Sequence, residues 1–291
     1  MIKNYAGQIY LTLAASIWGG MYVVSKVVLA VISPIELVWL RYFVALLTLS
    51  ILGLITRQSW QIRKKDLPLI IAIGIIGYSI SIWMQFLGTQ LSSAQMGAVI
   101  TSATPAFMAI FARILLGEQI TFKKALSVCL ATTGVLMIVG IGDLGDSSRL
   151  GGGILAIAAL TWALMSVLIK RVPNDYSQLV ITTYAILVAT VVITPFAVTE
   201  ITTSDLQVLT QPKVWGGVLY IGTVSTAGAF FLWNKGLQIV TATSAGLYFF
   251  FQPVVGTLLG WLFLGEQVGL TFWIGALLIL SGVLLVIKEE A

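Results

Sequence analysis

Long apolar runs separated by short polar segments follow one another along the whole chain. A bilayer core about 30 Å thick requires about 20 apolar residues in each crossing helix. Runs of this kind can be marked ten times, near residues 8–27, 34–55, 68–88, 93–114, 122–141, 152–171, 177–199, 214–234, 243–264 and 269–287. The pattern therefore predicts an all-α integral membrane protein with ten transmembrane helices and short connections.

The overall composition also indicates a lipid environment. Hydrophobic residues make up 58% of the 291 residues, charged residues make up 9%, and the mean hydropathy is +1.02. An ordinary globular protein has about 25% charged residues, enough to cover its surface in water. The first apolar run continues past Trp18 without a convincing cleavage motif, so we interpret it as an uncleaved first helix rather than a signal peptide.

The residue counts exclude several kinds of chemistry. The chain contains no histidine, which excludes His-based metal sites, His proton relays and Ser-His or Cys-His catalytic pairs. The string GIGD at 140–143 lacks the second aspartate in a facing span that an intramembrane aspartyl protease needs. No basic block with interleaved aromatic residues accompanies the net charge of +5. We therefore expect no enzymatic activity, no cofactor and no nucleic-acid partner.

The basic residues predict the orientation of the spans, because cytoplasmic loops are enriched in Lys and Arg. With the N-terminus inside, the cytoplasmic set has twelve members: Lys3, Arg57, Arg63, Lys64, Lys65, Arg113, Lys123, Lys124, Lys170, Arg171, Lys235 and Lys288. The outer set has three: Lys26, Arg149 and Lys213. An even number of spans returns the C-terminus to the same side, so both termini are expected in the cytoplasm.

The second half of the chain repeats the first. Three strings return after 148, 148 and 144 residues: LLGEQ at 115–119 as FLGEQ at 263–267, GVLMIV at 134–139 as GVLLVI at 282–287, and AASIW at 14–18 as AALTW at 158–162. The predicted domains are a five-helix repeat at 1–141, a linker loop at 142–151 and a second five-helix repeat at 152–291. Because five is odd, the second repeat is expected to enter the membrane inverted, an arrangement tied to alternating access around a central site.

These features resemble the EamA family of the drug/metabolite transporter superfamily. The resemblance rests on the two five-span halves, the small-residue-plus-Trp first helix of each half, the proline midway along each fourth helix, and the LGE box that ends that helix. It covers essentially the whole chain. It implies export of small metabolites across a plasma membrane, or the inner membrane of a bacterium. It also implies a cavity surrounded by helices one, three, four, six, eight and nine.

Polar side chains on these helices are expected to face the cavity or another helix, since facing hydrocarbon is costly. The predicted substrate-binding set lies on shared helix faces: Trp18, Tyr22, Tyr78, Gln85, Thr101, Thr104, Trp162, Ser166, Thr226, Trp233, Tyr248 and Gln252. Tryptophan and tyrosine also anchor helices at the membrane interface. That alternative suits Trp18 and Trp162 less well, because both lie mid-span and they correspond between the halves.

The two mid-helix prolines, Pro105 and Pro253, are candidate hinges. A proline inside a helix removes one hydrogen bond and releases the carbonyl four residues earlier, here Thr101 and Phe249. Such a carbonyl is tolerated in lipid only where a neighbour or a wet cavity satisfies it. The prolines could therefore form pivots beside the site, or static kinks.

Four charged residues are candidates for gating or coupling: Glu36, Arg41, Glu118 and Glu266. Glu36 and Arg41 are close enough in the second span to pair with each other, although Arg41 could also snorkel to the surface. Glu118 and Glu266 could act as gate latches, as proton sites, or as caps of the helix that follows each of them.

No acidic residue lies at the middle of any span, which favours facilitated diffusion or exchange over proton coupling. An aromatic, hydroxyl- and amide-lined cavity suits a neutral or zwitterionic amphipathic solute, with amino acids first. Aromatic faces also attract cations, so proton-driven efflux of drugs or organic cations is the alternative, and a channel or scaffold ranks lower. The string GTLLG at 256–260 fits a helix-packing face, either internal or in a homodimer, so the protein is expected to be a monomer or a homodimer in the lipid bilayer.

Overall fold

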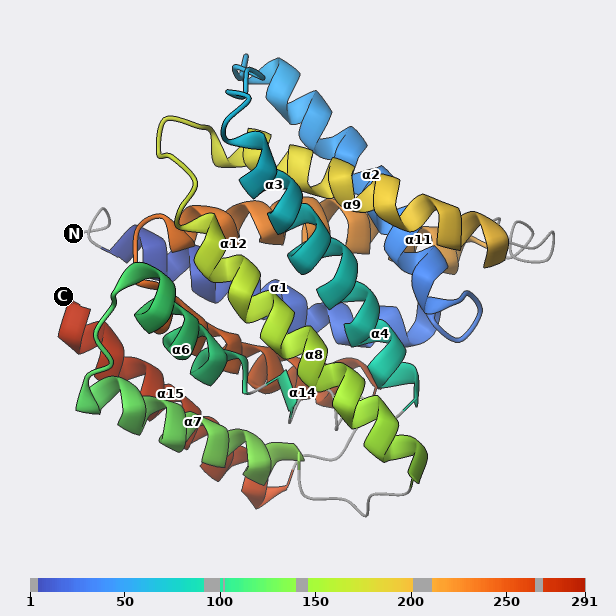
Figure 1. Cartoon of the computed structure of the whole chain (residues 1–291). Helices are drawn as coiled ribbons and strands as arrows, with labels where there is room; N and C mark the ends of the chain where they lie inside the picture. The colour runs from blue at the N-terminus through green and yellow to red at the C-terminus, as the bar shows by residue number, and fades with distance from the viewer. Residues whose placement is uncertain are drawn as a thin grey trace.

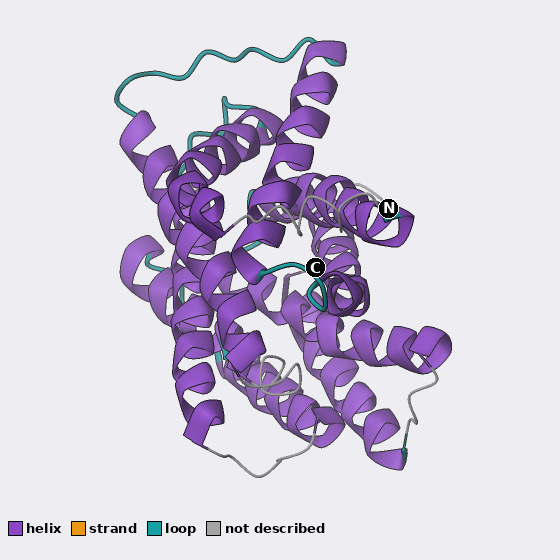
Figure 2. Ribbon diagram, turned by 90° about the vertical axis from the view of Figure 1, so that its right-hand side faces the viewer, coloured by secondary structure: helices purple, strands orange, loops and turns teal. Residues whose placement is uncertain are grey.

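The computed structural model is a bundle of helices (Figure 1). It describes residues 5–91, 100–101, 103–139, 146–200, 211–264 and 269–290. Within these ranges the regular structure is helical throughout, with no strand (Figure 2). A helix satisfies its own backbone hydrogen bonds, which is what a segment surrounded by lipid requires.

Most of the described helices coincide with predicted apolar runs, while the first part of the run at 93–114 lies largely outside the described residues. The first half contains α1 (Ala6–Val28), α2 (Pro34–Ile55), α3 (Leu67–Ile73), η2 (Gly74–Ser81), α4 (Ile82–Leu91), α6 (Thr104–Leu116) and α7 (Phe122–Val139). The second half contains α8 (Asp146–Ile169), α9 (Gln178–Glu200), α11 (Pro212–Tyr220), η3 (Ile221–Gly228), α12 (Ala229–Leu237), α13 (Ala242–Leu247), η4 (Tyr248–Phe250), α14 (Phe251–Leu264) and α15 (Leu270–Glu290).

Six helical stretches of the described residues are long and apolar enough to cross a membrane. They are Pro34–Ile55, Leu67–Leu91, Leu150–Ile169, Gln178–Glu200, Pro212–Leu237 and Ala242–Phe263. Their length and composition indicate a membrane-embedded, multi-pass fold, and the number of ten spans stays a prediction. The start of α1 and the end of α15 lie at the same side of the bundle (Figure 1).

Local sequence signals explain where the helices begin and end. Ser33 and Glu36 form a capping box at the start of α2, and Pro34 occupies its first turn, where no hydrogen bond is lost. Gly117 ends α6 with φ +71°, a left-handed conformation that favours glycine. This glycine is the centre of the first LGE box, which therefore acts as a stop signal for the helix.

The predicted third and eighth spans each contain a π-helical stretch at the corresponding position. η3 begins 147 residues after η2, and both are eight residues long. In each, a side-chain hydroxyl donates to the carbonyl five residues earlier, Ser79 to Gly74 at 3.1 Å and Thr226 to Ile221 at 2.7 Å. Segments of π-helix inside α-helices occur frequently at functional sites.

The two halves contact each other along several pairs of helices. α1 packs against α12 and α14, α2 against α9, α4 against α8, and α7 runs along α15 (Figure 1). Where α1 meets α14, a Cβ atom on Gly19 would lie only 2.7 Å from the Gln252 carbonyl oxygen, and one on Gly256 would contact Gly19 at 3.3 Å. The first glycine of GTLLG therefore serves an internal helix contact. The main hydrophobic core includes Trp18 and draws residues from both halves.

Candidate functional site

A cavity lies between the two halves at the centre of the bundle. It encloses about 480 Å³ of empty space, including the part open to the outside. Eight lining residues come from the first half and six from the second: Trp18, Met21, Arg41, Ser81, Ile82, Gln85, Thr101, Thr104, Ala158, Ala159, Trp162, Phe230, Phe249 and Gln252. The position of the cavity, between the two repeats, is where inverted-repeat transporters place their substrate site.

Aromatic rings from both halves form one wall of the cavity. Trp18 and Trp162, the corresponding tryptophans of the two halves, meet edge to face with ring centroids 5.5 Å apart. Phe249 stacks on Trp18 at 5.6 Å, and Phe230 contacts both tryptophans at 5.8 and 5.5 Å. Each such pair contributes about 0.5–1.5 kcal/mol beyond its buried area. The rings therefore hold one another in place and give the wall a fixed shape.

The two indole N–H groups differ in their partners. Trp18 Nε1 donates to the Ser225 carbonyl oxygen at 2.9 Å, which fixes α1 against η3. Trp162 Nε1 is buried without a hydrogen-bond partner. A buried donor without a partner costs about 1–3 kcal/mol, and this one belongs to a residue that lines the cavity.

Arg41 is the charged residue of the wall and comes from α2. Its side chain is 1% exposed, and its Nε donates to Thr226 Oγ1 in η3 at 2.7 Å. The guanidinium also lies over the rings of Phe86 and Phe230, each 5.7 Å from the ring centroid. Nη1 is buried and makes no hydrogen bond. The expected pairing with Glu36 is wrong, because Glu36 turns back to accept the Ser33 backbone N–H at 2.7 Å.

Neutral polar groups complete the lining. Gln85, Thr101 and Thr104 contribute from the first half, and Gln252 contributes from α14. Ser81 donates to the Ala158 carbonyl oxygen at 2.7 Å, which fastens η2 to α8 where small residues allow a close approach. Six members of the predicted binding set line this cavity: Trp18, Gln85, Thr101, Thr104, Trp162 and Gln252.

Other predicted residues lie behind the wall rather than in it. Tyr78 stacks on Phe230 at 4.7 Å and accepts a hydrogen bond from Asn234. Trp233 Nε1 donates to Ser166 Oγ at 3.3 Å, and its ring contacts Phe249 at 4.5 Å.

Three more members of the predicted set are not among the described residues that line the cavity. Thr226 holds Arg41, Tyr248 is buried in η4, and the side chain of Tyr22 falls outside the described part of α1.

The two prolines differ in their position. α6 begins at Thr104, so Pro105 lies in its first turn instead of the middle of the described helix. A proline in the first helical turn removes no hydrogen bond. Pro253 lies near the middle of the continuous helical stretch Ala242–Phe263, as predicted, directly after the short 3₁₀ segment η4 and as the third residue of α14. The role of both prolines as hinges stays a prediction.

Glu118 caps a helix, although a different helix from the expected one. Its carboxylate accepts the backbone N–H groups of Ala242 and Thr243 at 2.9 and 3.1 Å, and the Thr243 hydroxyl at 2.9 Å. These groups start α13 in the second half, whereas the sequence suggested the next helix along the chain, α7. Glu266, the corresponding residue, lies outside the described residues.

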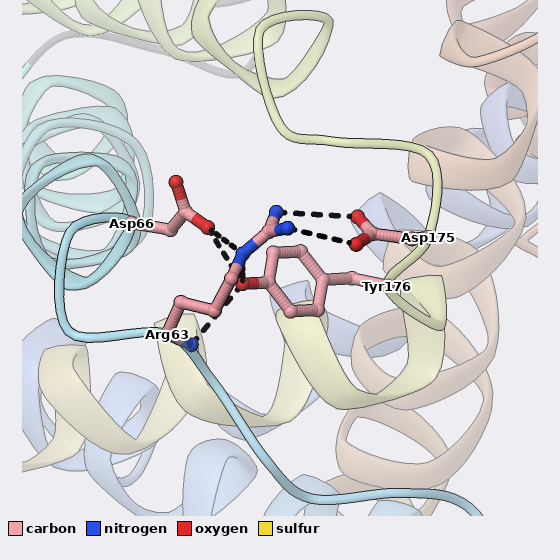
Figure 3. Close-up of polar contacts among 4 residues, drawn as sticks. All are labelled: Arg63, Asp66, Asp175 and Tyr176. Atoms are coloured by element: carbon pink, nitrogen blue, oxygen red, sulfur yellow. Dashed lines mark hydrogen bonds and ion pairs between the residues drawn. The ribbon is translucent and has the colours of Figure 1, made fainter.

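A polar cluster connects the halves at the end of the bundle that carries the predicted cytoplasmic loops (Figure 3). Arg63, just before α3, donates through Nε to Asp66 at 2.7 Å and contacts both carboxylate oxygens of Asp175 at 3.1 and 3.4 Å. Tyr176 donates to Asp66 at 2.6 Å. The Tyr176 hydroxyl and then the Arg63 guanidinium hold the pKa of Asp66 below its usual range. We call these four residues the loop latch.

Seven cavity residues were not predicted from the sequence. They are Met21, Ser81, Ile82, Ala158, Ala159, Phe230 and Phe249. A signal was available for Phe230, because it shares a helix face with Thr226 and Trp233 at i, i+4 and i+7. The predicted set did not include Phe230, because it was limited to polar, Trp and Tyr side chains.

The described residues contain no group of three or more His, Cys, Asp or Glu side chains that could hold a metal ion. The site therefore offers aromatic surface, amide and hydroxyl groups, and one guanidinium. These groups can bind and orient a small solute.

The EamA-like transporter family model matches residues 5–140 and again residues 149–288. An uncharacterized transporter of Archaeoglobus fulgidus is 25% identical over 97% of this chain and 99% of its own length. The uncharacterized transporter YetK of Bacillus subtilis is 29% identical over 100% of this chain and 90% of its own. The putative permease-like protein YdzE of Bacillus subtilis is 72% identical over 25% of this chain and 92% of its own.

A solved crystal structure has the same fold, with a TM-score of 0.81 and 18% sequence identity, covering 98% of this chain and 97% of that chain. The two matches of the family model together span nearly all of the sequence, one in each half. This chain therefore belongs to the EamA-like transporter family.

Proposed function

We propose that this protein exports small amphipathic metabolites, amino acids first among them, by alternating access of a cavity between its two halves. The observation that carries the proposal is the central cavity, whose wall combines aromatic rings with amide, hydroxyl and guanidinium groups from both halves. The rings suit an apolar side chain, and the polar groups suit the charged end of an amino acid.

The arrangement of the halves supports alternating access. The halves form an inverted repeat in this proposal, with both termini on the cytoplasmic side of a plasma membrane. Residues of the first half contact the second half at the cytoplasmic end through Glu118 and the loop latch. Breaking these contacts would open the cavity to the cytoplasm, where the exported solute is loaded.

The lining also favours facilitated diffusion or exchange over proton coupling. None of the described residues around the cavity is an Asp, Glu or His that could carry a proton through the cycle. The guanidinium of Arg41 in the wall works against cationic drugs as the main substrates.

The test is counterflow in proteoliposomes that contain the purified protein. Liposomes are preloaded with a pool of unlabelled amino acids, and uptake of each labelled amino acid is followed with and without an imposed pH gradient. Saturable uptake that is stimulated by the internal pool and indifferent to the gradient is expected. Uptake that never saturates would indicate a channel, and uptake of organic cations driven by the gradient would indicate a proton antiporter.

A further inference from the structure

Arg41 is the one charged side chain among the described residues that line the cavity. No described carboxylate lies within ion-pair distance of it, and Glu36 is engaged at the start of α2. Taking an unpaired cation out of water costs several kcal/mol. One hydrogen bond to Thr226 and contacts with three rings, those of Tyr42, Phe86 and Phe230, offset only part of this cost.

Two cavity-lining residues each have a hydrogen-bond donor without a partner. Nη1 of Arg41 and Nε1 of Trp162 are both buried and without a partner. The two side chains lie against the same ring, since Phe230 is 5.7 Å from the guanidinium carbon and 5.5 Å from the centre of Trp162. Both groups can only donate hydrogen bonds. Their natural complement is an anionic acceptor brought in by a ligand.

We infer that Arg41 binds the carboxylate of the transported solute, with the Trp162 indole N–H as a second donor. This inference rests on the proposed transport function and narrows its substrate class to amphipathic carboxylates. A guanidinium matches a carboxylate better than an ammonium does, because its planar fork can form two parallel hydrogen bonds. The rings of Trp18 and Phe249 then receive the apolar part of the solute.

The charge of Arg41 also makes the two halves of the site different from each other, although the halves are repeats. Arg41 lies in α2, whereas α9, the second helix of the other half, contains no basic residue. A solute with one carboxylate therefore binds in one orientation relative to the two halves. Thr226 fixes that orientation by holding Nε, which leaves the Nη side of the guanidinium for the solute.

The test uses three compounds that share a phenyl ring and differ in their charged groups: L-phenylalanine, 3-phenylpropionate, which lacks the amine, and phenethylamine, which lacks the carboxylate. Each competes with labelled L-phenylalanine for counterflow by the wild-type protein in proteoliposomes. The inference expects 3-phenylpropionate to compete within about tenfold of L-phenylalanine, and phenethylamine to be about 10- to 100-fold weaker, the range for losing a charged hydrogen bond.

Two variants at Arg41 and one control extend the test. Arg41→Gln should lower the apparent affinity for L-phenylalanine by about 10- to 100-fold and remove the preference for L-phenylalanine over phenethylamine. Arg41→Lys should keep this preference at a reduced affinity. The matched control is Arg113→Gln, which removes a positive charge from an exposed position on α6 and should change nothing. Binding to detergent-solubilised protein, measured by tryptophan fluorescence, gives a second readout for any variant that does not reconstitute.

The possible failures can be told apart. If the wild-type protein exchanges phenethylamine as well as L-phenylalanine, or if Arg41→Gln keeps the wild-type preference, the carboxylate inference is overturned and transport stands. If the wild-type protein exchanges none of the three compounds and no member of the amino-acid pool, the proposed function itself fails.

Discussion

At the scale of single residues, Trp162 joins the two properties of the cavity wall. Its ring contacts Trp18, Tyr78, Phe230 and Phe249, and its indole N–H has no partner in the protein. The ring contacts explain why this side chain keeps a fixed position, and the unpaired donor suggests that the position is used. The structural role and the proposed binding role of Trp162 can therefore be separated by substitution.

Trp162→Ala should reduce counterflow at least about tenfold, because it removes both a ring surface and a donor from the site. Trp162→Phe keeps a ring but removes the N–H, so its counterflow rate should fall less than that of Trp162→Ala. The measurement is initial counterflow rate per inserted protein. The control is Trp273→Ala, since Trp273 is 52% exposed on α15, away from the cavity. Equal rates in the wild-type protein and Trp162→Ala would contradict the placement of the site.

Gln252 provides an independent residue-scale test from the other side of the cavity. Its side chain is 7% exposed and lines the cavity from the start of α14. Gln252→Ala should lower the apparent affinity by about tenfold, the loss of one net hydrogen bond to the solute, while insertion into the membrane is unchanged. An affinity equal to that of the wild-type protein would show that this amide does not contact the solute.

At the scale of helices, the π-helical stretches decide which side chains reach the site. η3 approaches α2 closely at Gly222, where a Cβ atom would lie 2.5 Å from Val44 Cβ and 3.0 Å from the Arg41 carbonyl oxygen. This approach brings the Thr226 hydroxyl within reach of Arg41. The helix contact therefore supports the candidate site, although Gly222 itself has no side chain that could contact a solute.

Gly222→Ala should destabilise the protein by about 1–3 kcal/mol, as overpacking of a tight contact does. It should also weaken solute binding, because η3 must move away from Arg41. The matched control is Gly216→Ala on α11, where nothing lies within 4 Å of the added methyl group, and there a small gain in stability is expected. Thermal unfolding in detergent and counterflow affinity are the two measurements. A normal affinity in a destabilised Gly222→Ala would show that η3 does not position Arg41.

The helices could be located from the sequence because apolar runs of bilayer length are a strong signal. Much of the site followed from the repeat, since Trp18 and Trp162 correspond between the halves and meet at 5.5 Å. The partners of charged groups could not be predicted in the same way. Glu118 contacts Ala242, 124 positions away, and Arg41 contacts Thr226, 185 positions away. Such contacts depend on how the halves interlock, which local spacing does not encode.

At the scale of the whole molecule, the loop latch joins the segments before α3 and α9, one from each half (Figure 3). The pKa of Asp66 is lowered in the folded protein relative to its ordinary value of 3.8. A lowered pKa means that the contribution of Asp66 to stability is present above about pH 4 and is lost as the pH falls below that value. The latch should therefore be insensitive to pH between 5 and 8.

The corresponding measurement is thermal unfolding from pH 3 to pH 8. The wild-type protein should exceed Asp66→Asn in melting temperature by a constant amount from pH 5 to pH 8, and the difference should close below about pH 4, where Asp66 takes up a proton. A difference that is unchanged at pH 3 would show that the carboxylate charge is not what the latch uses.

Glu118 tests whether the halves separate at the predicted cytoplasmic end in the proposed transport cycle. Its carboxylate receives three donors at the start of α13, so Glu118→Gln removes a charge-assisted cap worth about 1–3 kcal/mol. If alternating access requires this contact to break, the variant should populate the cytoplasm-open state more. A cysteine placed in the cavity by Thr104→Cys, in a Cys129→Ser background, should then react faster with an impermeant maleimide added from the cytoplasmic side.

The matched control removes a carboxylate at the other end of the bundle. Glu200 is exposed and accepts one hydrogen bond, from Ser33 at 2.7 Å. Glu200→Gln should therefore leave labelling from the cytoplasmic side at the wild-type rate. Faster labelling in Glu118→Gln alone would identify the contact between Glu118 and α13 as a gate between the halves. Equal labelling in all three proteins would mean that Glu118 only caps α13, and that the halves move without breaking this contact.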